Sequence, residues 1–503
     1  MPRSIQRMFI ANRGEIALRV ARTCRRIGIV SVAACTRGEE RSPHAAACDE
    51  KVLLPGDGTA AYLDIDAMVE AAGRSGCQAV HPGYGFLAEN PRFATAVKDA
   101  GLIFVGPPAE AIRRMGDKGA AKKLARDNGV PTLDSVAEET PDEAGFASAA
   151  GRLGFPLLLK PRAGGGGKGM IKVECSEDLP GAINRSRHEG EAAFGDRRLL
   201  AETFAVRSRH VEVQIAADRI GSVRHLFDRD CSLQRRHQKI LEESPAPEID
   251  SGLRRRMREA AVTLAGAVGY QNLGTVEFLY DPAGSFHFLE MNTRLQVEHP
   301  VTEMVTGRDL VELQIRIAEG LSLEETVGKV RISGHAIEAR IYAEDPEGGF
   351  LPSPGRILLL RLPAGEGIRV DTGIAEGMKV GPAFDPLLMK LIAHGKDRVE
   401  AIERLDRALR ELVLLGVGTT VNFLLWILEQ EPVRRSRHDT GWIENHLSEY
   451  RVWEEARDVP SAVAVMRARE EHELQKKIMA AVEEPWFDDP FRTLGNWRLG
   501  EAR

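Results

Sequence analysis

The segment from Leu157 to Gly169 reads Leu-Leu-Leu-Lys-Pro-Arg-Ala-Gly-Gly-Gly-Gly-Lys-Gly. Its apolar start, which includes Lys160, predicts a short strand, and its glycines predict a loop. Consecutive glycines cost much backbone entropy, so they are typical of a backbone that approaches a ligand closely or moves. N–H groups in such a loop can cradle phosphate oxygens, although the P-loop pattern, with Ser or Thr after the lysine, is absent. Lys118, Lys160 and Lys168 would supply the positive charge that a triphosphate requires. A flexible linker is the alternative interpretation.

Two strand-like runs between Gly274 and Glu290 flank the turn sequence that begins at Asp281 and predict a β-hairpin. Glu277 and Glu290 fall on opposite strands, so their side chains are expected a few ångströms apart. Asn292 shares a face with Glu290. Two carboxylates and an amide oxygen suit Mg²⁺, which binds one or two carboxylates together with nucleotide phosphates. Their apolar neighbours favour a metal site over a solvated face, because burial without a partner is costly.

The chain continues from this hairpin as Glu290-Met-Asn-Thr-Arg-Leu-Gln-Val-Glu-His-Pro-Val-Thr-Glu-Met304. Arg294, Gln296 and Glu298 alternate, so an extended segment would place them on one face. A guanidinium offers a planar fork for a small oxyanion, and the adjacent carboxylate could act as a general base. The alternative is a polar strand edge held by a salt bridge.

A dense basic run extends from Asp228 to Lys239. Such a run is usually a solvated surface. Apolar residues at 226–227 and 240–241 bracket it, however, which indicates that it is anchored on both sides and makes a polyanion site plausible.

The N-terminus predicts a parallel α/β unit, with a strand at 7–11, a turn at 12–14, a helix at 16–27 and a strand at 29–34. The Gly-x-Gly-x-x-Gly fingerprint is absent, so dinucleotide binding is not indicated. Residues 77–87 predict a strand that ends in a rigid loop, where such folds bind ligands. Helices are predicted at 115–129, 303–319, 398–412 and 422–430, and antiparallel strands beyond about residue 333.

Composition bounds these interpretations. A chain of 503 residues with 43% hydrophobic and 28% charged residues is typical of a globular protein of two to four domains. The formal charge of −6 argues against a dedicated nucleic-acid binder. The six cysteines form no Cys-x-x-Cys pair, so no zinc or redox motif is indicated. No apolar run approaches the roughly 18 residues of a membrane span, and no leader is evident, so we expect a cytoplasmic protein without membrane partners.

Together these residues resemble the biotin carboxylase family of ATP-grasp enzymes over about residues 7–446. The specific motifs are those at 10–17, 81–90, 115–118, 164–169, 230–239 and 290–304. The resemblance implies an α/β fold, α+β overall. It comprises an N-terminal Rossmann-like domain at 1–115 and an ATP-grasp domain at 116–332 with a mobile glycine-loop lid at about 132–205. A mostly antiparallel C-terminal β domain with helices follows at 333–446, and then a helical and aromatic tail at 447–503.

The same resemblance implies roles for individual residues. ATP would be bound by Lys118, Lys160, Gly165, Gly166, Gly167, Lys168, Glu202, His210, Gln234 and His237, with adenine at the 202–205 hinge. Mg²⁺ or Mn²⁺ would be held by Glu277, Glu290 and Asn292. Bicarbonate would be bound by Lys239, Arg294, Gln296, Val297 and Glu298, with Glu298 as the base. Biotin would face Tyr84 and Arg340, and the catalytic set would be Arg294, Glu298, Lys239 and Arg340.

The resemblance also predicts partners. The sequence contains no Ala/Val-Met-Lys-Met biotinylation motif, so biotin is expected on a separate carrier protein or domain. A carboxyltransferase subunit and a homodimer are expected, with the aromatic segment at 486–497 as a docking element. The sequence departs from the family pattern at Thr203, Lys168, residues 36–49 and Phe384. The competing hypotheses are another ATP-grasp carboxylate–amine ligase, which would lack Arg340 with the 81–90 loop, and a non-catalytic nucleotide-binding scaffold.

Overall fold

The structure, a computed structural model, describes residues 4–139, 142–164 and 167–451. The tail at 452–503, and with it the predicted docking element, lies outside the described residues. The described chain up to Tyr450 forms one compact unit.

The N-terminal part is the predicted parallel α/β unit. Its sheet has the order β3-β2-β1-β4-β5 with every pairing parallel. Apolar clusters cover both faces, one around Phe9 and Tyr62 and the other around Met8 and Ile16. The elements are β1 Arg7–Ile10, α1 Gly14–Arg26, β2 Val30–Cys35, α2 Pro43–Ala47, β3 Glu50–Leu53, α3 Gly58–Leu63, α4 Ile65–Arg74, β4 Ala79–His81, α5 Pro91–Asp99, β5 Ile103–Phe104 and α6 Ala109–Gly116.

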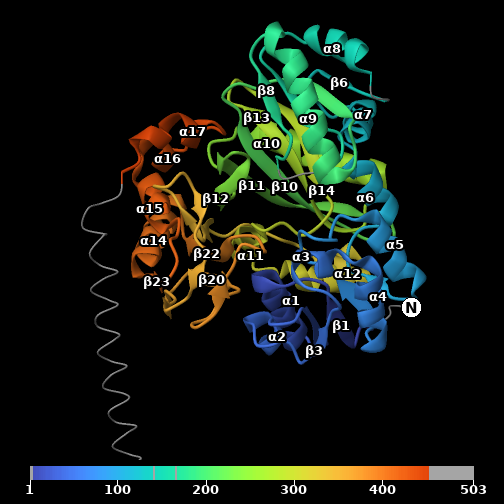
Figure 1. Ribbon diagram of the computed structural model, residues 1–503, viewed down its shortest axis with the longest axis vertical. Coiled ribbons are helices and arrows are strands. Elements are labelled where there is room, and N and C mark those ends of the chain that lie inside the picture. The colour runs from blue at the N-terminus through green and yellow to red at the C-terminus, as the bar shows by residue number, and fades with distance from the viewer. Residues whose placement is uncertain (1–3, 140–141, 165–166, 452–503) are drawn as a thin grey trace, which may run out of the picture. The chain divides into compact units, whose positions relative to one another are not determined.

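A separate antiparallel sheet of order β6-β9-β7-β8 carries the start of the glycine loop. Helices α8 and α9 pack on this lid sheet around a small apolar core (Figure 1). The elements are α7 Lys118–Asp127, β6 Ser135–Ala137, α8 Glu143–Gly151, β7 Leu157–Pro161, β8 Ile171–Val173, a 3₁₀ turn Ser176–Asp178, α9 Leu179–Phe194 and β9 Leu199–Thr203.

The largest sheet runs without interruption through the rest of the unit, in the order β14-β13-β10-β11-β12-β15-β22-β20, and its pairings are all antiparallel. The predicted hairpin at 274–290 is confirmed as β13 and β14. The elements are β10 Arg209–Ala217, β11 Val223–Arg235, β12 Gln238–Ser244, α10 Ser251–Val268, β13 Asn272–Asp281, β14 Ser285–Asn292, α11 His299–Thr306, α12 Leu310–Glu319, α13 Leu323–Thr326, β15 His335–Tyr342, β20 Ile368–Thr372 and β22 Leu387–Gly395.

Short strands and helices complete the C-terminal part, where the predicted helices at 398–412 and 422–430 are confirmed. These elements are β16 Glu344–Asp345, β17 Leu351–Pro352, β18 Gly355–Arg356, β19 Leu359–Arg361, β21 Lys379–Val380, α14 Arg398–Glu411, β23 Val413–Leu415, α15 Val421–Glu429, α16 Glu431–Arg434, α17 Trp442–His446 and a 3₁₀ turn Leu447–Glu449.

Two predicted helices were wrong in extent. The helix predicted at 303–319 is two helices, α11 and α12, because Gly307 takes a left-handed conformation (φ +64°) and Asp309 caps α12. The helix predicted at 115–129 begins only at Lys118, where the Asp117 side chain accepts a hydrogen bond from the Ala120 N–H. That cap sets Lys118 at the very start of α7.

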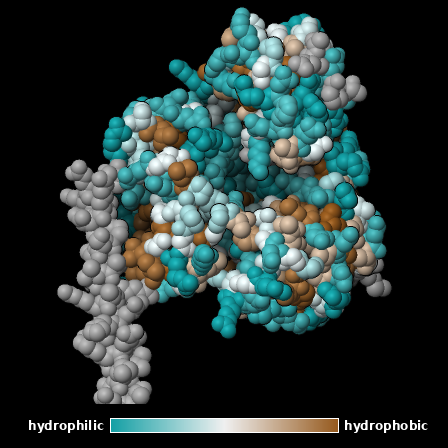
Figure 2. All heavy atoms as spheres, viewed as in Figure 1, coloured by the Kyte–Doolittle hydropathy of each residue, from teal (hydrophilic) through white to brown (hydrophobic). Residues whose placement is uncertain are grey.

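The exposed surface is largely hydrophilic in the view of Figure 2, with separate apolar spots. Among the described residues, no helix combines the length and apolar character that crossing a membrane requires.

Candidate active site

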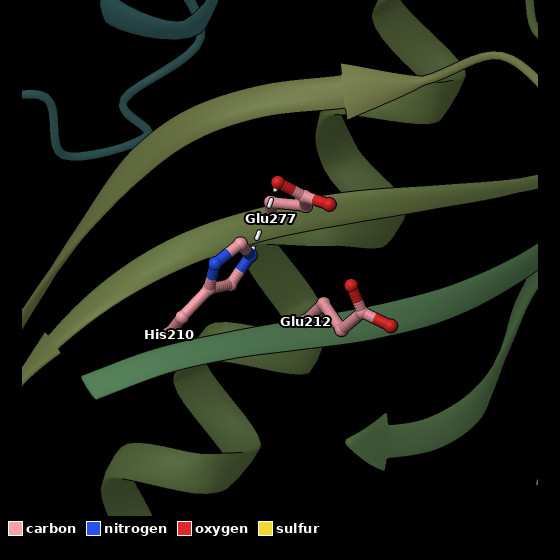
Figure 3. Close-up of side chains that lie close together, drawn as sticks. All are labelled: His210, Glu212 and Glu277. Atoms are coloured by element: carbon pink, nitrogen blue, oxygen red, sulfur yellow. Dashed lines mark ion pairs between the residues drawn. The ribbon is translucent and has the colours of Figure 1, made fainter. Parts of the chain in front are cut away.

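A row of charged side chains crosses the large sheet. Arg229 on β11 pairs in register with Glu212 on β10, Glu212 with Glu277 on β13, and Glu277 with Glu290 on β14. Figure 3 shows Glu212 and Glu277 side by side on adjacent strands, with His210 joined to Glu277. Like charges on neighbouring strands repel, so three carboxylates in line require cations beside them. The predicted proximity of Glu277 and Glu290 is confirmed.

Lys239, at the start of β12, supplies one of these cations. Its Nζ lies 2.7 Å from Glu212, 2.9 Å from Glu277 and 2.6 Å from Glu298. Burial alone would lower the pKa of Lys239, but Cys231 and the surrounding carboxylates raise it well above its ordinary value. The ammonium therefore stays charged and joins the acidic row to Glu298.

Glu277 is the most connected acid of the row. Besides Lys239, its Oε1 accepts from Asn292 Nδ2 at 2.8 Å and from Gln296 Nε2 at 3.0 Å, and its Oε2 lies 3.0 Å from His210 Nε2. Burial would raise the pKa of Glu277, but Lys239 and His210 outweigh it and lower the pKa. This carboxylate is thus ionised.

Glu290, at the end of the row, is different. Within the described part of the chain no hydrogen bond or ion pair reaches its carboxylate, and burial together with Glu277 raises its pKa. A hard cation between Glu277 and Glu290 would remove that repulsion, so these two residues fit Mg²⁺. The amide oxygen of Asn292 accepts from Arg294 Nη2 at 2.9 Å, so Asn292 is beside the pair but already engaged.

The segment after β14 is not the extended strand that the alternation predicted. From Thr293 to Glu298 the chain bends and turns into α11. Arg294 is held by Glu89 Oε2 at 2.7 Å from its Nε, and its Nη1 lies 3.2 Å from Gln296 Oε1. Arg294 and Glu298 therefore reach the same site by a turn and not by a shared strand face.

Glu298 is fully buried between two cations. Its Oε1 accepts from Lys239, and its Oε2 accepts from Arg340 Nη2 at 2.8 Å. Burial would raise the pKa of Glu298, but Lys239 and Arg340 lower it well below the ordinary value. The Nε of Arg340 also donates to Glu242, whose pKa burial raises to about 7. Glu298 is thus ionised, in the state that a general base requires.

The other end of the segment is held by Lys390. Its buried Nζ donates to the Val297 carbonyl at 2.8 Å and lies 3.3 Å from Glu15. The same ammonium lies 5.9 Å from the centre of the Tyr84 ring. Tyr84 thus borders the site from the N-terminal unit, on the side of Val297.

The predicted nucleotide-binding lysines lie where the lid sheet meets α7. Lys160 forms an ion pair with Glu202, and Lys122 reaches the other oxygen of Glu202 at 2.7 Å. Burial would raise the pKa of Glu202, but the two lysines lower it to about 2. Lys118 donates to the carbonyl of Gly164 at the start of the glycine loop. Lys118 and Lys160 thus lie near the point where β7 leads into the glycine loop.

The glycine loop contacts the turn between β11 and β12. A Cβ placed on Gly167 would lie 2.8 Å from the Cβ of His237, so the loop backbone packs directly on that residue. Lys168 is exposed, and Gln234 is buried on β11. Gly165 and Gly166 lie outside the described residues.

The run at 228–239 is not the solvated surface that such charge runs usually form. Arg229 is fully buried and donates to Glu212, Gln214, Thr275 and Thr302. Asp230 pairs with Arg209, and Arg235 with Glu344. Most of the run holds strands together, and a polyanion site stays a prediction for the part of the run that includes Gln234, His237 and Lys239.

Sequence reasoning missed five charged residues that contact the predicted site: Glu89, Lys122, Glu212, Glu242 and Lys390. Glu89 belongs to the motif at 81–90, and Glu212 lies two residues after His210 on the same strand face. The sequence therefore contained a pattern that could have identified both residues. No such pattern marked Lys390 and Glu242, because their partners are more than 90 residues away in sequence.

Three family models match the chain in order. The biotin carboxylase N-terminal domain matches residues 4–112, the carbamoyl-phosphate synthase L chain ATP binding domain matches 117–326, and the biotin carboxylase C-terminal domain matches 338–445. The central match, with the lid and the acidic row, defines the class: an ATP-dependent enzyme of the ATP-grasp type. The flanking matches decide against a different ligase of that class, and the chain belongs to the biotin carboxylase family.

Relatives agree with this assignment. The biotin carboxylase of Halalkalibacterium halodurans is 45% identical over 443 residues, which cover 88% of this chain and 98% of the relative. The mitochondrial methylcrotonoyl-CoA carboxylase subunit alpha of Dictyostelium discoideum is 45% identical over 444 residues, or 88% of this chain and 64% of that subunit. This chain therefore spans less than two thirds of the length of such alpha subunits.

A solved structure gives the same result. The biotin carboxylase domain dimer of the 2-oxoglutarate carboxylase from Hydrogenobacter thermophilus, in complex with MgADP, ADP and bicarbonate, has a TM-score of 0.86 and 38% identity, and the match covers 89% of this chain and 99% of that one. That domain therefore binds a nucleoside diphosphate with magnesium, and bicarbonate.

Proposed function

We propose that this chain catalyses the first half-reaction of a biotin-dependent carboxylase: it activates bicarbonate with ATP and places the carboxyl group on biotin held by a carrier protein or domain. One observation carries the proposal. Lys239 forms ion pairs with both Glu277, a proposed Mg²⁺ ligand, and Glu298. Glu298 in turn pairs with Arg340. The residues that we propose as metal ligand, base and biotin contact therefore lie around one small volume.

The nucleotide phosphates are assigned to Lys118, Lys160 and the glycine loop, with His210, His237, Gln234 and Glu202 nearby. Mg²⁺ held by Glu277 and Glu290, next to Asn292, would neutralise phosphate oxygens during transfer. The lysines stabilise the same charge from the lid side. The lid excludes water, which would otherwise hydrolyse carboxyphosphate, the intermediate that forms from bicarbonate and the γ-phosphate of ATP.

Bicarbonate is assigned to Lys239, Arg294, Gln296 and Val297. Glu298 takes the proton of bicarbonate while an oxygen of that anion attacks the γ-phosphorus and ADP leaves. The resulting carboxyphosphate breaks down to CO₂ and phosphate, and the released phosphate takes the proton of the biotin ureido nitrogen. Arg340, whose Nη2 lies at the site, stabilises the negative charge that deprotonation leaves on the ureido oxygen, and the nitrogen then attacks CO₂. Tyr84 borders the biotin side.

The partners proposed are a biotin carrier, a carboxyltransferase subunit and a second copy of this chain. Support comes from the homologous alpha subunits and from the dimer of the Hydrogenobacter domain. The acyl or 2-oxo acid acceptor belongs to the carboxyltransferase. The proposed division at residues 115, 332 and 446 is supported by the ranges of the three family models.

The test is release of ADP by the purified chain with MgATP, bicarbonate and free biotin. Turnover that requires both bicarbonate and biotin supports the proposal. Tight ATP binding with no bicarbonate-dependent turnover would overturn it. Co-purification of the chain with and without residues 450–503 tests the tail as a docking element, and an unchanged set of partners would remove that role.

A further inference from the structure

Glu89 makes a two-sided contact with the start of the segment at 293–298. Its Oε1 accepts from the Thr293 N–H at 2.9 Å and from the Thr293 hydroxyl at 3.3 Å, while its Oε2 accepts from Arg294 Nε at 2.7 Å. One carboxylate therefore fixes both a backbone N–H and the guanidinium next to it. The partners lie more than 200 residues from Glu89 in sequence.

The loop that carries Glu89 is itself firmly anchored. Asn12 Nδ2 donates to the carbonyls of Pro82 and Tyr84, each at 2.8 Å. Leu87 is buried, and the next residue after Glu89, Asn90, caps α5 by accepting from two backbone N–H groups. The Glu89 carboxylate is thus presented from a fixed backbone.

Three side chains and one backbone carbonyl accept from the Arg294 guanidinium. The side chains are Glu89 at Nε, Asn292 Oδ1 at Nη2 and Gln296 Oε1 at Nη1, and the Leu295 carbonyl also accepts from Nη1, at 3.3 Å. Glu89 alone among these three carries a full negative charge, and charge-assisted hydrogen bonds are about twice as strong as neutral ones. Without it, the guanidinium would be drawn toward Glu277 and Glu298, the other acids whose charge acts on Arg294.

We propose that Glu89 is a positioning residue for bicarbonate: it holds Arg294 by its Nε, so that the Nη groups face the anion and Glu277 and Glu298 stay available. This inference rests on the proposed function. It assigns to the N-terminal unit, which also carries Tyr84, control over the arginine that binds the anion.

The contacts of Glu89 give the test a direction. Its carboxylate bonds to Thr293 and Arg294, and neither residue is assigned to the nucleotide phosphates. Removing its charge should therefore leave binding of MgATP unchanged. Binding of bicarbonate should weaken, and a general loss of structure would not separate the two substrates in this way.

The experiment compares E89Q with wild type and with the matched control E50Q. Glu50 is also in the N-terminal unit and pairs with Arg7 at the same distance of 2.7 Å; its side chain is 51% exposed, compared with 40% for Glu89, and it lies on β3. ADP release is measured against bicarbonate and against MgATP, with free biotin present, and melting temperatures are recorded. We expect the KM for bicarbonate to rise about tenfold in E89Q, because the loss of one charge-assisted hydrogen bond lowers affinity by about that factor. The KM for MgATP should not rise, and E50Q should match wild type.

An unchanged KM for bicarbonate in E89Q would overturn the inference. So would an equal rise in both KM values together with a fall in melting temperature, repeated in E89A, because that pattern indicates a structural tie only. If wild type itself shows no turnover that depends on bicarbonate and biotin, the proposed function fails instead, and the two failures are thereby distinguished.

Discussion

At the scale of single residues, Glu298 is set apart by its surroundings. It is buried between Lys239 and Arg340, and both cations lower its pKa after burial has raised it. Its neighbours thus keep it ionised, while each of its oxygens remains within reach of a cation that could also hold a substrate. The proposed chemistry of the site depends on this one carboxylate.

We therefore expect E298Q to lose turnover by about a hundredfold or more, the usual contribution of a positioned general base. The amide keeps the shape and one acceptor, so binding of MgADP should persist. Turnover measured at saturating bicarbonate and nucleotide binding by calorimetry test this. Retention of more than about a tenth of the activity would contradict the role of base.

Glu15, at the start of α1, predicts a pH dependence of stability. Burial raises its pKa from 4.5 to about 6. As pH rises through this range, the unfolded chain releases a proton that the folded protein still holds, so folding becomes less favourable until about pH 6 and then levels off. The shift corresponds to about 2 kcal/mol.

E15Q lacks this titration. The melting temperature of E15Q relative to wild type should therefore rise between about pH 5 and about pH 7. Parallel melting curves across that range would show that Glu15 does not carry the proton.

At the scale of elements, what the sequence could predict depended on how local the contacts are. The β13–β14 hairpin, with Glu277 opposite Glu290, was predicted from two strand-like runs and the turn residues between them. The bend at Thr293–Glu298 did not, because Glu89 and Lys390 hold it from distant parts of the chain. The run at 228–239 is anchored, as the bracketing apolar residues predicted, but its partners could not be predicted for the same reason: Arg229 finds its four acceptors on β10, β13 and α11.

The glycine loop gives a prediction at this scale. Gly167 has φ +73°, and a Cβ there would press on His237. G167A should raise the KM for MgATP about fivefold or more, since 1 kcal/mol of lost lid packing has that effect. The matched control is G195A at the end of α9, which has φ +69° and nothing within 4 Å of an added Cβ.

G195A should lower the melting temperature slightly through its backbone strain and leave the KM for MgATP unchanged. Equal KM values in the two variants would mean that contact with His237 does not matter for nucleotide binding.

At the scale of the whole molecule, Arg19 joins the N-terminal unit to the helices behind the site. It is buried on α1 and lies 2.6 Å from Glu303 on α11 and 2.8 Å from Asp309, the cap of α12. Arg26 reaches the same Asp309 at 2.8 Å, but its side chain is 53% exposed. Asp309 therefore accepts from one buried arginine and one exposed arginine, so the two ion pairs can be compared directly.

R19A should destabilise the protein by about 2–3 kcal/mol, because it removes a buried, hydrogen-bonded charge and leaves Glu303 only Arg369 and Asp309 only Arg26 as charged partners. R26A should cost less than about 1 kcal/mol, as exposed ion pairs do. Thermal unfolding of both variants measures the difference, and similar melting temperatures would contradict the importance of burial here.

The unbroken eight-stranded sheet restricts how this enzyme can move. Strands β12 and β15 place Glu242 and Arg340 side by side while joining the half proposed to bind the nucleotide to the C-terminal half by backbone hydrogen bonds. The two halves cannot rotate apart about a hinge without tearing that ladder. We therefore predict that opening for substrate entry falls to the separate lid sheet, while the acids and bases of the large sheet keep their places.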